Sequence, residues 1–246
     1  MKFAPLAFAA LLASPAAAFD VSAMSEAERT AFRAEVRAYL LENPEVLSEA
    51  IEVLQSRQAK AAAQGDLALV KANAKDLFED GHSFVGGNPD GDLTIVEFID
   101  YRCSYCRKAH AEVQELVASD GDIRYIVKEF PILGDQSVIA SRFAIATLQV
   151  AGREAYEKVN AGFYESFRGD VTKETLIAFA TDLGLDSAAI MAKMDAPEVT
   201  KVIEDNHLLA QRMQISGTPT FVMGEQMLRG YAPLEAMRAI VADERG

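Results

Sequence analysis

The stretch "VEFIDYRCSYCRKAH", residues 96–110, decides the fold of this 246-residue chain. It holds the only two cysteines, Cys103 and Cys106, after an apolar run and before a stretch that favours a helix. A cysteine at such a strand-to-helix junction lies near the unpaired N–H groups of the first helical turn, which favour the thiolate and lower the thiol pKa. The pattern predicts a redox pair in which Cys103 attacks a disulfide and the more covered Cys106 resolves the product.

A structural bridge and a metal site are the alternatives for this pair. Two cysteines that close so short a loop remove little chain entropy, so a structural disulfide here would stabilise the fold poorly. Cys103, Cys106 and His110 fall at positions i, i+3 and i+7 of one helical face, and thiolates bind copper(I) or zinc. Zinc normally takes four ligands, and a histidine here is more often packed against the sheet. We favour redox exchange, assign no metal ligand, and keep copper binding by Cys103 and Cys106 as an alternative.

The first residues have the pattern of a secretory signal peptide, predicted for residues 1–18. Lys2 precedes an apolar stretch, and Ala16 and Ala18 are small residues at the positions that a signal peptidase reads. The alanine-rich signal indicates a bacterial periplasm, where disulfides persist. We therefore expect the partners to be cysteine-containing secreted proteins and a membrane redox protein that resets the cysteines.

Acidic residues outnumber basic ones. The chain has 37 Asp and Glu against 24 Lys and Arg, a net charge of −13, and removing Lys2 with the signal gives −13 − 1 = −14. Such a surface repels phosphate backbones, so we expect no nucleic-acid partner. After the signal, no apolar run approaches the roughly 20 residues that span a bilayer, and we expect a soluble mature protein.

Residues 19–65 are expected to form an N-terminal helical segment with a helical linker at 55–65. Ser25 and Glu28 match a capping box, and Asn43 is expected to cap a second helix that begins at the following proline. Two short helices cannot bury all of this segment's apolar residues. We expect the segment to build a homo-oligomer, with folding back onto the downstream domain as the alternative.

Residues 66–246 are expected to form an α/β domain in which a helical block interrupts a sheet. The order of elements is strand, helix, strand, four or five helices, two strands and a helix. The expected elements are a hairpin joining 84–85 to the strand 93–99 through a turn at 88–91, a helix to about 118, a strand at 123–130, a helical insertion at about 134–214, a hairpin turning near 224–225 and a last helix at 234–241.

Glu97 is the one acid in the apolar run "LTIVEFI". By strand alternation it shares a side of the sheet with Ile95 and Ile99. Burial would raise its pKa, so that it exchanges protons with Cys106. An exposed acid at a sheet edge is the alternative.

The second signal is "SGTPTF", residues 216–221, in which Pro219 precedes a strand. Proline lacks the N–H that a ladder needs, and X-Pro bonds are where cis peptides occur. A cis Thr218–Pro219 bond would leave the backbone of Thr218 free to pair with an extended substrate beside the thiols.

With "EFxDYxCxYC", "KEFPILG" and "GTPTF", residues 66–246 resemble the DsbA-like branch of the thioredoxin superfamily. "YLLENPEVL", residues 39–47, resembles the N-terminal element of the ScsC-like proteins, which are associated with copper tolerance and in some members form a trimer. The resemblance implies a thioredoxin-like fold with an inserted helical domain, a trimer as one candidate assembly, copper as one candidate ligand, and no cofactor beyond the Cys103–Cys106 disulfide. It also implies that Cys103 is the nucleophile, Cys106 the resolving cysteine, Glu97 the buried acid and Thr218–Pro219 the cis-proline loop.

The residues between the cysteines depart from the oxidases of that branch. Strong oxidants usually have Pro-His there, whereas this chain has Ser104 and Tyr105, and a threonine such as Thr218 before the cis-proline is more usual among isomerases. Ser104, Tyr105 and Thr218 are expected to contact the substrate. We favour a disulfide isomerase or reductase linked to copper tolerance over a DsbA-type oxidant; a scaffold in which the thiols do not matter is a third alternative.

Overall fold

The computed structural model describes residues 21–246. The predicted signal peptide, residues 1–18, lies outside the described residues. The chain divides into two compact units, Met1–Gln58 and Ala59–Gly246. Among the described residues, no helix has both the length and the apolar composition needed to cross a membrane.

The first unit contains a short 3-10 helix (Val21–Ala23), α1 (Glu26–Glu42) and the first part of α2 (Glu45–Ala72). The capping box at the start of α1 is confirmed. The backbone N–H of Glu28 donates to Ser25 Oγ at 3.3 Å, and the backbone N–H of Ser25 donates to Glu28 Oε2 at 2.8 Å. These two bonds satisfy donors that a helix start otherwise leaves unpaired.

Asn43 does not cap α2, and that prediction is wrong. Its backbone N–H and its side-chain amide both donate to the carbonyl oxygen of Tyr39, each at 2.9 Å. The side chain therefore closes the end of α1, because the last carbonyls of that helix also lack partners. α2 then runs without a break through residues 55–65, which are helical as predicted.

Apolar side chains of α1 and α2 are exposed in the first unit. No residue of α1 is buried. Eight large apolar residues are between 41% and 63% exposed, and they are Phe32, Val36, Tyr39, Leu41, Leu47, Ile51, Val53 and Leu54. Large apolar patches on a surface mark interaction sites.

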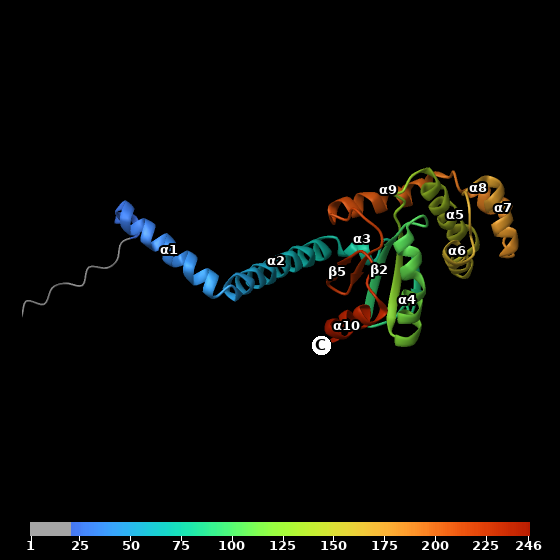
Figure 1. Cartoon of the computed structure of the whole chain (residues 1–246). Coiled ribbons are helices and arrows are strands. Elements are labelled where there is room, and N and C mark those ends of the chain that lie inside the picture. Colours follow the sequence, from blue (N-terminus) through green and yellow to red (C-terminus); the bar gives the residue numbers. More distant parts are fainter. Residues whose placement is uncertain (1–20) are drawn as a thin grey trace, which may run out of the picture. The chain divides into compact units, whose positions relative to one another are not determined.

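The second unit is the predicted α/β domain with an inserted helical block (Figure 1). Its five strands form one sheet in the order β1-β3-β2-β4-β5, and five helices, α5 to α9, lie between β3 and β4 in the chain. After the end of α2, the elements are α3 (Ala74–Phe78), β1 (Phe84–Gly87), β2 (Leu93–Ile99), α4 (Ser104–Asp120), β3 (Ile123–Glu129), α5 (Asp135–Ala151), α6 (Arg153–Glu165), α7 (Lys173–Asp182), α8 (Ser187–Lys193), α9 (Pro197–Arg212), β4 (Thr220–Met223), β5 (Gln226–Arg229) and α10 (Leu234–Arg245).

The sheet pairing confirms one predicted hairpin and corrects the other. β4 and β5 pair antiparallel around the turn near Gly224, as predicted. β1 does not pair with β2; it pairs antiparallel with β3, with Phe84 opposite Val127. The turn at residues 88–91 does form, since Gly91 N–H donates to Asn88 O at 3.0 Å. β1 cannot pair with β2, because β3 and β4 occupy both sides of β2. The turn therefore connects two strands that have β3 between them.

The two faces of the sheet have separate cores. Ile95 and Ile99 of β2 face a core that includes residues of α4, α10 and the insertion. Val96 and Phe98 face a second core with residues of α2, α3 and α9. β2 is covered on both faces and paired on both edges, so a charged residue on it is buried.

Candidate active site

Cys103 lies at the junction that the sequence predicts. It is the N-cap residue of α4, four residues after the end of β2, and it is only 8% exposed. In its thiol form, Cys103 donates from Sγ to the carbonyl oxygen of Thr218 at 3.2 Å. The Thr218–Pro219 peptide bond is cis. The fold thus brings together two loops that lie 115 residues apart in the sequence.

The pKa of the Cys103 thiol is lowered from 9.0 to about 5. The largest cause is the hydrogen bond from the Cys106 side chain; burial opposes it, and the Thr218 side chain and the backbone N–H groups of Cys106 and Tyr105 add to it. These donors lie in the first turn of α4 and in the cis-proline loop. Cys103 is therefore a thiolate at neutral pH, which is the nucleophilic form.

Cys106 has the opposite environment. It is 1% exposed, and burial raises the pKa of its thiol; the hydrogen bond to Cys103 and repulsion by Glu97 raise it further. Both cysteines are free thiols in the structure. The two sulfurs are thus differentiated as the sequence suggests, with an acidic outer thiol and a protonated inner one.

Glu97 is buried, at 3% exposure, in the middle of β2, so the alternative of an exposed edge acid is wrong. Burial raises the pKa of its carboxyl group to about 7, the hydrogen bond from the Tyr125 hydroxyl lowers it, and the charge on Cys103 raises it. A carboxyl group with this pKa exchanges protons readily near neutral pH. Electrostatic coupling to both cysteines places it where it can serve the Cys106 thiol.

The two residues between the cysteines are exposed. Ser104 begins α4, and Tyr105 is 59% exposed. Both are therefore accessible beside Cys103, and their contact with a substrate, like that of Thr218, stays a prediction.

His110 is buried in the way expected of a packed structural residue. It is 6% exposed, its ring centre lies 4.9 Å from that of Tyr164, and its Nε2 is 3.8 Å from Glu165 Oε1. Burial lowers the pKa of its imidazole. Within residues 21–246, no group of three or more His, Cys, Asp or Glu side chains is placed to hold a metal ion.

Sequence reasoning missed Asp100, which organises the loop before Cys103. One carboxylate oxygen accepts from the backbone N–H of Arg102 and the Ser137 hydroxyl, both at 2.8 Å. The other accepts from the backbone N–H groups of Ile132 and Leu133, at 2.8 and 3.0 Å. This carboxylate ties the active-site loop to the start of the insertion, and no short-range sequence signal links these segments.

Sequence reasoning also missed a second buried acid, Glu129, at the end of β3. Its side chain accepts hydrogen bonds from the hydroxyls of Tyr101 at 2.7 Å, Tyr156 at 2.6 Å and Ser141 at 2.7 Å. Burial raises the pKa of its carboxyl group to about 7, and the three hydroxyls lower it. The same signal as for Glu97 was available, a lone acid in phase with the buried Tyr125 of its strand.

The fold and the site define a thioredoxin-like oxidoreductase, and comparison with known proteins agrees. The family described as "Thioredoxin" matches residues 79–243, and the chain therefore belongs to this family. The family described as "Copper resistance protein ScsC N-terminal domain" matches residues 28–61. These two matches confirm the resemblance to the DsbA-like and ScsC-like proteins noted from the sequence.

Solved structures show the same fold. A thioredoxin-like oxidoreductase from Silicibacter pomeroyi DSS-3 is 37% identical, with a TM-score of 0.65, over 70% of this chain and 96% of that one. ScsC from Proteus mirabilis, in a transitional conformation, is 24% identical, with a TM-score of 0.63, over 90% of this chain and 98% of that one. The second match is evidence for the fold alone.

Among curated relatives, the Na(+)/H(+) antiporter NhaA of Herminiimonas arsenicoxydans is 30% identical over 164 residues. The match covers 66% of this chain but only 26% of the antiporter. The chain therefore spans about a quarter of the length of the curated relatives that it matches first.

Proposed function

We propose that this protein is a periplasmic disulfide isomerase or reductase that acts on secreted proteins through Cys103 and Cys106. The observation that carries the proposal is the position of Cys103, whose low-pKa thiol lies 3.2 Å from the carbonyl oxygen of Thr218 in the cis-proline loop. An attacking sulfur beside the cis-proline loop suits a disulfide held in an extended peptide.

The proposed cycle starts with attack of the Cys103 thiolate on one sulfur of a client disulfide. The client S–S bond breaks, a Cys103–client disulfide forms, and the other client sulfur leaves as a thiolate. In isomerisation, that or another client thiolate attacks the mixed disulfide and restores Cys103. In reduction, the Cys106 thiol loses its proton to Glu97 and its sulfur attacks Cys103, so that the client leaves reduced and the Cys103–Cys106 disulfide forms.

The preference for an isomerase or reductase over an oxidant is based on Ser104, Tyr105, Thr218 and the N-terminal helices. The sequence between the cysteines lacks the Pro-His of strong oxidants, and isomerisation needs a reduced Cys103 and a surface that holds a misfolded client. The exposed apolar residues of α1 and α2 support self-association into a homo-oligomer, such as a trimer, because burying them removes apolar area from water. A DsbA-type oxidant is the alternative.

Recovery of active ribonuclease from its scrambled form tests the proposal. A variant with Leu47→Glu, Ile51→Glu and Leu54→Glu places charges on one face of α2, at residues about half exposed. We expect the wild type to be active and oligomeric by light scattering, and the variant to lose both properties. The control is Glu52→Gln in the same helix. If the wild type fails to recover scrambled ribonuclease but still oxidises reduced ribonuclease, the protein is a DsbA-type oxidant instead.

Export and a link to copper tolerance belong to the same proposal. The pattern of residues 1–18 supports export, and the match of residues 28–61 to the ScsC N-terminal domain supports the copper link. Growth of a deletion strain in copper, complemented with wild type or with Cys103→Ser, tests the link. We expect only the wild type to restore growth, whereas rescue by Cys103→Ser would favour a scaffold role.

A further inference from the structure

Three guanidinium groups surround a small cavity beside the active-site loop. The cavity has a volume of about 180 Å³. Small-molecule sites are typically about 300 to 1,000 Å³, so this cavity suits a single side chain of a larger partner. Its lining consists of Tyr101, Arg102, Arg107, Phe163, Phe167, Arg168, Gly169 and Val171.

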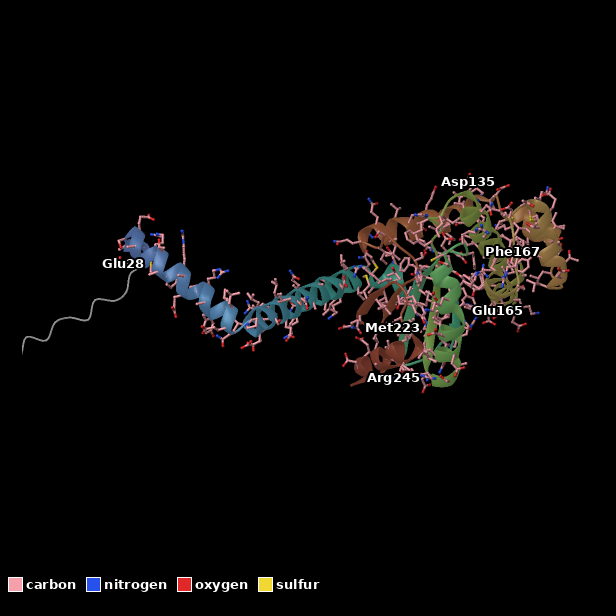
Figure 2. The ribbon with its side chains drawn as sticks, in the orientation of Figure 1. Glu28, Asp135, Glu165, Phe167, Met223 and Arg245 are labelled. Atoms are coloured by element: carbon pink, nitrogen blue, oxygen red, sulfur yellow. The ribbon has the colours of Figure 1, made fainter. Side chains whose placement is uncertain are left out.

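Two residues that line the cavity, Arg102 and Arg107, lie on either side of Cys103 in the chain. Arg102 directly precedes Cys103, and Arg107 lies one helical turn after it, with its backbone N–H donating to the Cys103 carbonyl at 3.1 Å. Arg168 comes from the segment that follows α6 in the insertion; Phe167, labelled in Figure 2, is its neighbour in the chain. A client bound at Cys103 and Thr218 therefore has the cavity within reach of its neighbouring residues.

The three arginines are not neutralised by carboxylates. Arg102 Nη1 donates to the carbonyl oxygen of Gly169 at 3.0 Å, Arg107 Nη1 to that of Tyr164, and Arg168 to two carbonyl oxygens of its own turn. Within the described part of the chain, none of them forms an ion pair. Repulsion by Arg168 and Arg102 adds to burial in lowering the pKa of Arg107, so the three charges are close together.

The acids close to these arginines in the chain have other partners, and Asp100 accepts from the backbone N–H of Arg102 and the Ser137 hydroxyl rather than from a guanidinium group. The Glu165 carboxylate lies 3.8 Å from His110 Nε2, and the Asp170 carboxylate accepts from Gln136 Nε2 at 3.1 Å. In a chain with a net charge of −13, three unneutralised cations at one cavity are unusual. Guanidinium groups bind carboxylates through paired N–H donors.

The floor of the cavity is aromatic. Tyr101 and Phe163 have ring centres 4.5 Å apart, and Phe163 and Phe167 have ring centres 5.3 Å apart. Such a floor packs against the methylene groups of an acidic side chain while the arginines bind its carboxylate.

We propose that this cavity is a subsite for an acidic side chain next to the reacting cysteine of the client. The subsite rests on the proposed function, since it has meaning only if Cys103 reacts with a client peptide. Its occupant is a Glu or Asp side chain of a polypeptide, and a small anionic disulfide such as oxidised glutathione is the competing source of the same carboxylate.

The test measures the rate at which the reduced full-length protein reacts with two matched peptide disulfides, one with Glu and one with Gln beside the cysteine. We expect the Glu peptide to react about two- to fivefold faster at low salt, because an exposed guanidinium–carboxylate pair has about this effect and is screened by salt. Arg102→Gln combined with Arg168→Gln should make the two peptides react at the same rate. Arg168→Lys should retain part of the preference, and Lys158→Gln, which removes an exposed charge on α6, is the control.

The outcomes separate the two proposals. If neither peptide reacts, the proposed thiol chemistry fails, and the subsite fails with it. If both peptides react equally fast with the wild type, the thiol chemistry stands and the subsite is overturned. The subsite is also overturned if the arginine variants slow only oxidised glutathione, because the anion site would then serve a small molecule.

Discussion

Glu97 and Glu129 are two buried acids on neighbouring strands and on the same face of the sheet, yet their surroundings differ. Burial raises the pKa of both carboxyl groups to about 7. Glu97 accepts a hydrogen bond from one hydroxyl, that of Tyr125, and faces the two thiols. Glu129 accepts from three hydroxyls, one in the loop before α4 and one each in α5 and α6. The same raised pKa therefore occurs in one carboxyl group beside the two thiols and in another that attaches the insertion to the sheet.

The largest expected difference between the two acids is in stability. Glu129→Ala leaves the hydroxyls of Tyr101, Tyr156 and Ser141 buried without their acceptor. An unsatisfied buried group costs about 1–3 kcal/mol, so we expect the free energy of unfolding to fall by about 3–5 kcal/mol. Glu97→Ala, which strands only the Tyr125 hydroxyl, should cost about 1–3 kcal/mol. Urea unfolding of both reduced variants measures this, and equal losses would show that the hydroxyl network does not stabilise the fold.

The pH dependence of stability includes a contribution from Glu129, and Glu97, whose pKa is also raised to about 7, acts in the same direction. The pKa of Glu129 is higher in the folded protein than in the unfolded chain. Its contribution to the stability of the folded state is therefore fully present below pH 4.5 and is lost as pH rises through about 7. The loss is about 3 kcal/mol, from a pKa difference of about 2.5 units. His110 and Cys103 have lowered pKa values and act in the opposite direction over overlapping pH ranges.

The effect of Glu129 is therefore measured as the difference in the free energy of unfolding between wild type and Glu129→Gln. Both reduced proteins are unfolded at pH 4.5 and at pH 8. We expect the wild type's advantage in free energy of unfolding over Glu129→Gln to shrink or reverse as pH rises. Parallel curves would mean that Glu129 does not change its protonation in this range.

The effect on catalysis should be the reverse of the effect on stability. Glu97→Gln cannot accept the Cys106 proton, and loss of a general base slows such a step by about a hundredfold or more. We expect the Cys103–client disulfide to accumulate when reduced protein is mixed with a peptide disulfide and quenched with acid for mass spectrometry. Glu129→Gln is the matched control and should resolve the intermediate at nearly the wild-type rate. Resolution by Glu97→Gln at that same rate would remove Glu97 from the mechanism.

The smallest expected effect belongs to Tyr125→Phe. The Tyr125 hydroxyl lowers the pKa of Glu97, so its loss should raise that pKa further. A hydrogen bond of about 0.5–1.5 kcal/mol corresponds to roughly 0.4 to 1 pKa unit. Because Glu97 must be ionised to accept a proton, the rise of the resolution rate with pH should move up by that amount. An unmoved profile in stopped-flow measurements would assign the titration to another group.

The difference between the two acids also shows what the sequence can reveal. Glu97 is predictable because alternation along one strand places it beside Ile95 and Ile99, and its thiol partners follow within ten residues. Glu129 carries the same local pattern, but its partners Tyr156 and Ser141 come from helices of the insertion, and their positions depend on how those helices pack. Strand periodicity can therefore predict that an acid is buried, but the role of that acid depends on tertiary contacts that the periodicity does not reveal.

The errors in the fold have the same origin. The turn at residues 88–91 is correct as local chemistry, yet the strand before it pairs with β3, since pairing depends on which sheet edges are free. The arginine cavity could not be predicted either, because Arg168 lies 61 residues beyond Arg107 and reaches it only through the end of α6. The cysteine pair, the cis-proline and the β4–β5 hairpin were predictable, since each depends on residues that are close in the chain.

The connection of the insertion to the sheet has a consequence for how such proteins diversify. β2 and β3 run parallel and end at the same edge of the sheet, and β4, antiparallel to β2, begins at that edge. The insertion therefore leaves and re-enters the sheet at the edge where Cys103 and the start of α4 lie. A change in the length of a loop at either end of the insertion would alter the surroundings of the two sulfurs without adding a residue to any strand.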